Sequence, residues 1–513
     1  MRVSTNGGLV TENWFDLNAS RYTPSSTLQR MELLKTGYMG TLSLGWDNYL
    51  FLELTGRQER SSTLKDQSFF YPSANLSFLF TQAFHMPSWW NYGKLRLSYG
   101  IVGNAPETYT ANIVYEQGSD NGFTWNTIPS SWGNADIRPE KKYEYEIGLE
   151  SKFLNNRLGI DVSYYNNRVK DQILSTPQPS TSGVKNVLMN VGEVANHGWD
   201  ISISATPILT RDFRWDLTAN YGVYKNKVVK LADGVPYLEI LNSGGSGIKI
   251  QAVEGQPMGD IYAQVPQVNE NGEYLVSDKG LYLNQTELQK VGNINPAGVG
   301  GLFNSFSYKN VFLDFSIDFR IGGDVINEMN QYATAVGLTP ESLKYRDTEH
   351  GGLSYYYPGD NNSSGIPVQV DPSTGAGPNG EIIYHDGIIL PGVVASTGER
   401  NTRIIPAGYY YNTTYNWGTE AEQLTYRHSV FDNSYVKLRE LTIGYQFPEK
   451  IISKLGLGRL SVSVFGRNLF YFYKALKNYD AESSVGTSWA NQATVGSSTT
   501  ATRSFGVSLR ASF

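Results

Sequence analysis

The chain ends on Ser504-Phe-Gly-Val-Ser-Leu-Arg-Ala-Ser-Phe513, in which apolar and polar side chains alternate strictly. Phe505, Val507, Leu509, Ala511 and Phe513 would share one face of an extended strand, because successive side chains of a strand point to opposite faces. About ten such residues are enough to cross a bilayer as a tilted strand. The pattern therefore predicts a strand whose two faces meet different media.

The same period-two pattern recurs along the chain. It returns at 143–150, 158–165, 199–205, 213–223, 313–321 and 460–465, with weaker copies near 36–46, 49–57, 74–84 and 93–102. In 313–321 the polar face carries Asp314, Asp318 and Arg320, which a water-filled lumen needs and a soluble core does not. The repetition predicts an all-β protein, a transmembrane antiparallel β-barrel with a polar interior and an apolar band facing lipid.

Short and long connections alternate between these segments. Short ones are expected at 47–48, 155–156, 207–212, 309–310 and 448–458, and long ones at 103–140, 169–196, 227–300, 322–434 and 470–501. Outer-membrane barrels have tight periplasmic turns and long extracellular loops. Counting from about residue 9 gives about fourteen strands, the last of which ends on the short-turn side. Such barrels commonly end on an aromatic residue, so Phe505 and Phe513 are predicted to form an assembly signal.

Composition excludes several other classes of protein. The 513 residues show no linker-like break and no apolar run of the roughly twenty residues that a membrane helix needs. The 35 Tyr and 10 Trp suit interfacial girdles and a vestibule that contacts ligand. The absence of Cys excludes disulfides and thiolate chemistry, and a net charge of −6 argues against a nucleic-acid partner. Residues 1–8 lack the apolar stretch of a secretory signal, so we expect the chain to be part of a longer protein.

Five blocks resemble the carboxy-terminal barrel of SusC/RagA-like TonB-dependent transporters of Bacteroidetes. They are IRPEKKYEYEIGLE (137–150), NVGEVANHGWD (190–200), NPAGVGGLFN (295–304), DNSYVKLRELTIGYQFP (432–448) and FGRNLF (465–470). The blocks are specific in combination, in order and in spacing. The family's fold is a twenty-two-stranded barrel with an amino-terminal plug.

The resemblance implies that residues 1–513 form the carboxy-terminal part of such a barrel, without the plug, TonB box or signal peptide. It implies location in the outer membrane of a Gram-negative, Bacteroidetes-like cell, in contact with membrane lipid. The expected function is TonB-dependent uptake of an oligosaccharide (glycan) or oligopeptide (peptide) substrate. The expected partners are a SusD-like surface lipoprotein and the TonB complex, the latter acting through the missing amino-terminal region.

Aromatic residues of the long loops are the candidate substrate-binding groups, because flat aromatic faces among amides and carboxylates suit sugars and peptides. They are Trp125, Trp132, Tyr355, Tyr356, Tyr357, Tyr409, Tyr410, Tyr411, Trp417 and Trp489. The alternative is that these side chains pack inside their own loops or face the partner lipoprotein.

No pattern of catalytic or metal-binding residues stands out. Residues 360–371 have part of a calcium-loop spacing but lack its helices and its bidentate Glu, and Gly244–Lys249 lacks the end of a phosphate loop. The five histidines show no metal-ligand spacing. We therefore expect no metal, no cofactor and no enzymatic activity. Two alternatives stay open: a complete passive channel of about fourteen strands, and an outer-membrane enzyme or carbohydrate-binding all-β protein.

Overall fold

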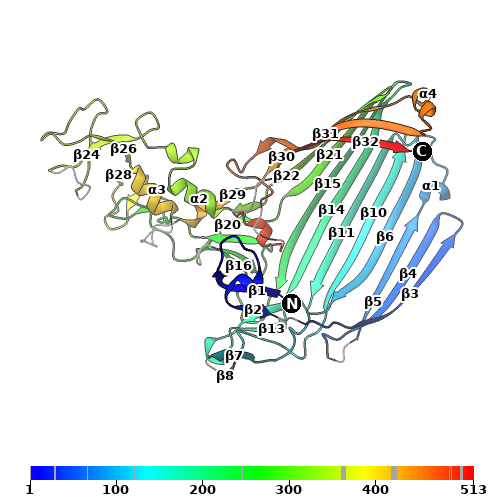
Figure 1. The fold of residues 1–513 in the computed structure, drawn as a ribbon, viewed down its shortest axis with the longest axis horizontal. Helices are drawn as coiled ribbons and strands as arrows, with labels where there is room; N and C mark the ends of the chain where they lie inside the picture. Colours follow the sequence, from blue (N-terminus) through cyan, green and yellow to red (C-terminus); the bar gives the residue numbers. More distant parts are fainter. Residues whose placement is uncertain are drawn as a thin grey trace.

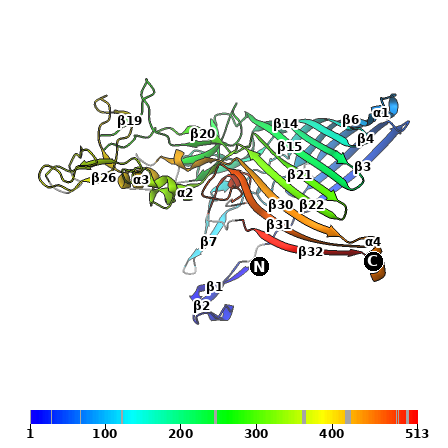
Figure 2. The same ribbon diagram turned by 90° about the horizontal axis from the view of Figure 1, so that it is seen from above.

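A curved antiparallel sheet of thirteen strands dominates the computed structural model, which describes residues 2–27, 30–65, 68–120, 123–243, 247–359, 365–416, 425–483, 486, 488–496 and 501–512. Its strands, in spatial order, are β3 (Lys35–Trp46), β4 (Leu50–Ser61), β5 (Ser68–Phe78), β6 (Trp90–Asn104), β10 (Glu140–Phe153), β11 (Leu158–Lys170), β14 (Glu193–Leu209), β15 (Phe213–Lys230), β21 (Gly298–Tyr308), β22 (Val311–Ile321), β30 (Tyr435–Gln446), β31 (Arg459–Lys474) and β32 (Ser504–Ser512). The strands run side by side in Figure 1, and Figure 2 shows the curvature of this section of barrel wall.

The two faces of the sheet differ in chemistry along every strand. Residues directly opposite in an antiparallel ladder share a face, so Ile147, Tyr164 and Trp199 lie together on one side. The opposite side carries charges such as Glu150 and Asp161, which are opposite each other. On β32 the apolar side chains Phe505, Val507 and Leu509 are at least 70% exposed, as lipid-facing residues of an isolated barrel wall would be. The predicted all-β membrane-barrel architecture is confirmed, while Phe513 lies outside the described residues.

Connections at one end of the sheet are short, as predicted. Asp47, Asn48, Asn155 and Asn156 have positive φ between 45° and 62°, the backbone conformation that tight hairpin turns require and that Asn and Asp tolerate. The remaining turns at this end include two short helices, α1 (Phe80–Ala83) and α4 (Glu449–Ile452). All five predicted long connections lie at the other end of the sheet.

The strand count differs from the predicted fourteen. β1 (Arg2–Leu9) and β2 (Ser20–Thr27) pair with each other in a separate hairpin and not with the wall. Gly7 and Gly8 have positive φ and the ladder shifts register beside them, so this segment cannot supply a regular alternating strand. Within the described residues β3 and β32 are the two edges of the sheet and are not paired with each other. The wall is therefore not the closed fourteen-stranded channel of the alternative prediction.

The long connections fold into small sheets and helices beyond the end of the wall (Figure 1). The small sheets contain β7 (Glu116–Asp120), β8 (Phe123–Thr127), β9 (Ser131–Trp132), β12 (Ile173–Pro177), β13 (Asn186–Asn190), β16 (Tyr237–Ser243), β17 (Ile248–Val253), β18 (Asp260–Ala263), β19 (Leu275–Val276), β20 (Gln289–Asn293), β23 (Asp324–Ile326), β24 (Leu353–Tyr356), β25 (Val368–Gln369), β26 (Tyr384–Ile388), β27 (Val393–Val394), β28 (Ile405–Pro406) and β29 (Val430–Asp432). The helices are α2 (Glu328–Ala335) and α3 (Ala407–Tyr415), with short 3-10 turns at Leu17–Ala19, Ser180–Ser182, Pro340–Leu343, Tyr426–Ser429, Ser453–Leu455 and Asn491–Ala493. Ile248, Ile250, Ile261 and Ile326 are fully buried, so these loops possess a hydrophobic core of their own. No helix among the described residues is long and apolar enough to span a membrane.

A charge placed on the outward face of the wall is expected to block assembly. Ile317 lies near the middle of β22 on the outward face, and Ser316 beside it points inward opposite Glu440. Arginine at the bilayer midplane of a barrel's lipid face costs about 2–4 kcal/mol. Ile317→Arg should therefore sharply lower the heat-resistant folded barrel recovered from outer membranes, and Ser316→Arg should not. Equal recovery of the two variants would contradict the assignment of the faces.

Candidate functional site

A bulge in β30 gathers charged side chains on the inner face of the wall. Leu438 is opposite Ile317 and Glu440 is opposite Ser316, which leaves Arg439 as an extra residue between them. The ladder to β31 shifts at the same place, and Asn468 there has a φ of 54°. Such bulges re-aim side chains and are common next to functional sites.

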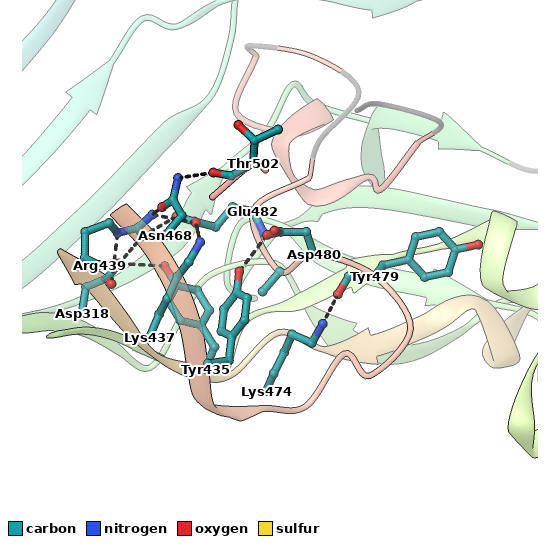
Figure 3. Close-up of polar contacts among 12 residues, drawn as sticks. Asp318, Tyr435, Lys437, Arg439, Asn468, Lys474, Tyr479, Asp480, Glu482 and Thr502 are labelled. Carbon is teal, nitrogen blue, oxygen red and sulfur yellow. Dashed lines mark hydrogen bonds and ion pairs between the residues drawn. The ribbon is translucent and has the colours of Figure 1, made fainter. Parts of the chain in front are cut away.

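Arg439 is the centre of this cluster (Figure 3). Its guanidinium forms a two-pronged ion pair with Asp318 of β22, in which the Nε–Oδ1 distance is 3.2 Å. It also donates to both carboxylate oxygens of Glu482, at 2.8 and 2.6 Å, and to Oδ1 of Asn468 at 3.0 Å. The planar fork of arginine suits such two-pronged binding of carboxylates. Arg439 thus joins two strands of the wall to the last long loop.

Lys437 supports the same contact from the next inward position. Lys437 is 1% exposed. Its Nζ lies 2.6 Å from Oε2 of Glu482 and 4.7 Å from the ring centroid of Tyr471. Burial opposes ionisation of Glu482, but hydrogen bonds from Arg439 and Lys437 outweigh it and hold the pKa of Glu482 below its usual range. The Glu482 carboxylate therefore stays charged and tied to the wall.

Further contacts hold the loop that follows β31 against the wall and the loop layer. Asn433 Nδ2 donates to the carbonyl of Ala481 at 2.9 Å, and Lys474 Nζ donates to the carbonyl of Tyr479 at 2.7 Å. Farther along, the backbone N–H of Val495 donates to the carbonyl of Ile326 at 2.8 Å. The described part of this loop is therefore fixed at the mouth of the lumen.

A cavity of about 660 Å³ lies beside the cluster on the wall. Its polar lining includes Asp318 and Arg320 of β22, Asp200 of β14 and the pair Arg96–Asp161, whose Nη2–Oδ1 distance is 2.6 Å. Both signs of charge are present together with hydroxyl groups, so the cavity can accept hydrogen-bonding groups of either kind. The cavity suits a polar ligand or a polar protein segment.

The predicted tyrosines come together in one lobe, mostly as core residues. Tyr355, Tyr357 and Tyr411 are 1%, 5% and 3% exposed, respectively. The Tyr355 hydroxyl donates to Oδ1 of Asp386 at 3.1 Å, and the Tyr411 hydroxyl donates to backbone carbonyls of the 340–344 turn. Tyr409 and Tyr410 pack against a second small cluster around Leu281, and Tyr356 is half-buried. These placements favour packing within the loop for the buried members, and substrate contact by any of them stays a prediction.

The predicted tryptophans lie at separate places. Trp125 on β8 is 46% exposed and lies across Gly118, where a side chain would collide with its ring. Trp132 on β9 meets Tyr115 edge-on, with the ring centroids 6.4 Å apart. Trp489, in the last long loop, is 37% exposed and lies against Gly259 of the 227–300 connection. Trp417 falls outside the described residues, as do 360–364 of the calcium-like spacing and 244–246 of the glycine run.

The sequence reasoning did not single out Arg439, Asn468 or Glu482. One signal was available, because Arg439 and Glu440 are adjacent charges inside an otherwise alternating strand, and such an interruption indicates a bulge. Glu482 could not be found this way, since it lies 43 residues from Arg439 along the chain.

Acid is expected to loosen the segment around His428. Burial, assisted by the charge of Arg427, lowers the pKa of His428 from 6.5 to about 4, and its ring stacks on Tyr415 with centroids 4.4 Å apart. Between pH 6.5 and about 4 the unfolded segment takes up a proton that the folded segment does not, so its stability falls as pH falls and is constant above 6.5. Hydrogen exchange of peptides covering 425–432, corrected for intrinsic rates, should show this. His428→Phe keeps a ring that can stack on Tyr415 and should abolish the pH dependence of exchange in this segment. An unchanged pH dependence in His428→Phe would contradict the role of His428.

Comparison with known proteins shows which family this wall resembles. Residues 5–253 match the family model described as "TonB dependent receptor-like, beta-barrel". Over these residues, just under half of the chain, the wall is similar to a TonB-dependent-receptor barrel. That family consists of receptors and transporters rather than enzymes. The chain is 24% identical over 494 residues to "TonB-dependent receptor P3" of Formosa agariphila, which covers 88% of this chain and 42% of that protein.

Two further relatives agree with this assignment. "TonB-dependent receptor SusC" of Bacteroides thetaiotaomicron is 30% identical over 247 residues, 44% of this chain and 24% of SusC. Among solved structures, the "RagAB peptide transporter" is similar with a TM-score of 0.64 and 18% identity, covering 92% of this chain and 48% of that one. The chain therefore spans less than half the length of each of these relatives. The predicted resemblance to SusC/RagA-like proteins is confirmed.

Proposed function

We propose that this barrel wall belongs to an outer-membrane nutrient importer that takes up oligosaccharides or oligopeptides. The observation that carries the proposal is the division of the sheet into an apolar outward face and a charged inner face, capped by folded long loops. A lumen of this kind passes polar solutes, and the similarity to TonB-dependent receptors supports energised uptake rather than passive flow. Residues 1–513 would supply the later strands of a larger barrel.

The proposed partners follow from the relatives. SusC and RagAB are similar to the chain, and the RagAB title names a peptide transporter, so peptide is one substrate class supported. The proposal includes a SusD-like surface lipoprotein that covers the loop layer and a TonB complex that supplies energy. The partly exposed aromatics Trp125, Tyr356 and Trp489 are the proposed contacts for substrate or lipoprotein.

The test is uptake by cells that carry or lack the full-length protein. Fluorescent oligopeptides and oligosaccharides of about five to ten units would be supplied separately, with and without a protonophore that collapses the proton gradient. One of the two classes should enter only in cells that have the protein and an intact gradient. Uptake that continues at the same rate after the gradient has collapsed would contradict the importer proposal and favour a passive channel.

A further inference from the structure

Five cations cluster on the outward face of three strands within a group of four adjacent strands, at the end nearest the long loops. They are Lys141 on β10, Arg168 and Lys170 on β11, and Lys225 and Lys227 on β15, and we call them the outer-rim cations. Lys141 is directly opposite Lys170, and Arg168 and Lys227 are both opposite Ala195 of β14. They share the outward face with Tyr143, Tyr164 and Trp199.

These cations have few counter-charges on their own face. The outward positions of β10, β11, β14 and β15 are all described and include one carboxylate, Glu193, whose Oε1 lies 2.9 Å from Arg168. Lys141, Lys225 and Lys227 form no ion pair within the described residues, and Lys170 lies 5.8 Å from the ring centroid of Tyr143. Like charges directly opposite in a sheet are destabilising, as at Lys141 and Lys170, so the arrangement favours an external anion.

The chain as a whole does not explain this excess of positive charge. Its net charge is −6. The inner face of the same strands carries acids, among them Glu144, Glu150 and Asp161. On these strands the outward face near the long loops therefore carries an excess of cations, while the inner face carries many acids.

The aromatic residues fix the level of the outer-rim cations relative to a bilayer. On β10, Tyr143 and Phe153 lie ten residues apart on the outward face, and Phe153 packs with Trp90 at 5.4 Å between centroids. Ten residues at about 3.3 Å each, tilted by about 40°, span roughly 25 Å, the height of a barrel's apolar band. Tyr164 is opposite Ile147, four residues nearer the short turns than Tyr143, and packs with Trp199 on the outward face at 4.9 Å between centroids. Arg168 is opposite Tyr143, at the upper edge of this band, and Lys141 and Lys170 lie two residues farther toward the long loops, where lipid headgroups sit.

We propose that the outer-rim cations bind the phosphorylated headgroup of a glycolipid in the outer leaflet. Lysine ammonium and arginine guanidinium groups bind phosphate oxygens through charge-assisted hydrogen bonds, and the four strands span roughly 15 Å. A cavity of about 300 Å³ lies at the rim between Lys170 and Lys230. Asp171, Glu193 and Asp233 also line it, so it can accept hydrogen bonds from sugar hydroxyls next to the phosphate. A lipid is the occupant that fits, because the same face continues below into the apolar band.

The test removes positive charge from the outer-rim cations (the patch variant) and compares lipid binding with that of a variant that loses the same charge elsewhere. In the full-length protein purified from outer membranes, Lys141, Lys170, Lys225 and Lys227 are changed together to Gln. The matched control changes Arg211, Lys309, Lys450 and Lys454, four exposed cations at the short-turn end, to Gln. The probes are bisphosphorylated lipid A, the same lipid enzymatically stripped of phosphate, and inorganic pyrophosphate. Binding is measured by native mass spectrometry after delipidation, with heat-resistant migration as the check on folding.

The patch variant should bind bisphosphorylated lipid A at least tenfold more weakly than wild type, and the control variant should match wild type. Wild type should prefer the phosphorylated lipid over the stripped lipid by a similar factor, and this preference should shrink in the patch variant. Equal binding by the two variants would overturn the proposal. Pyrophosphate bound as tightly as the lipid would overturn the choice of a glycolipid. Nutrient uptake is measured separately, so failure of the importer proposal would not be confused with either result.

Discussion

Replacing Arg439 by alanine is expected to release the last long loop from the barrel wall. Among the described residues, the guanidinium is the one group that contacts Asp318, Asn468 and Glu482 together. Its loss removes the described cation beside Asp318, while Glu482 keeps its contact with Lys437. Breaking a buried pair costs several kcal/mol, but these side chains are about one-third exposed. Solvent screening reduces the expected cost to about 2 kcal/mol, which corresponds to roughly thirtyfold more frequent local opening.

The measurement is hydrogen exchange of peptides covering 475–483 in the full-length protein. The matched control is Arg467→Ala on the neighbouring strand, which removes an exposed ion pair with Glu440 and should cost less than about 1 kcal/mol. Arg439→Lys keeps the positive charge but loses the planar guanidinium, so its hydrogen-exchange rate should lie between those of the two alanine variants. Exchange in Arg439→Ala that matches Arg467→Ala would show that the cluster does not hold the loop.

Excising the distal lobe of the longest loop is expected to abolish uptake while the barrel still assembles. Residues 338–404 contain β24–β27 and the buried pair Tyr355 and Tyr357, and lie between α2 and α3, which are neighbours in Figure 1. A short Gly-Ser linker between the two helices should leave the core around Ile326 in place. Uptake should fall to background because the loop surface that faces the outside is lost.

This experiment separates the contributions of two loops. Removal of the β7–β8 hairpin, residues 116–127, takes away Trp125 and leaves the tyrosine lobe intact. The variant that lacks the hairpin should retain more uptake than the variant that lacks residues 338–404 if those residues form the main binding surface. Full uptake by the lobe variant, with normal folded protein in the outer membrane, would place the site elsewhere.

Strands and turns were predictable because they obey local rules. The alternation of Leu313 to Ile321 and the Asn155-Asn156 turn each depend on a few neighbouring residues, and both match the structure. The predicted count began near residue 9 and so included one strand of the first hairpin, whose two strands pair with each other and not with the wall. The number of strands in the sheet is thirteen for that reason.

The site was less predictable because its contacts join distant parts of the chain. Asp318, Arg439 and Glu482 lie more than 40 residues apart, and a bulge decides that Arg439 reaches both carboxylates. Aromatic content alone did not distinguish the exposed Trp125 from the buried Tyr355, since a loop long enough to bind ligand also needs a core. Surface and core aromatics therefore look alike until the loop's own packing is known.

The two unpaired edges of the sheet bear on how such a protein enters the membrane. β3 and β32 each present a row of backbone N–H and C=O groups that no described strand satisfies. In hydrocarbon each such group costs several kcal/mol, so a wall with open edges has no stable resting place in the bilayer. If a longer protein supplies the strands that complete the barrel, as we propose, those strands are expected to pair with both edges as the wall enters the bilayer. A half-inserted wall would expose two unpaired strand edges, at which other strands could pair incorrectly.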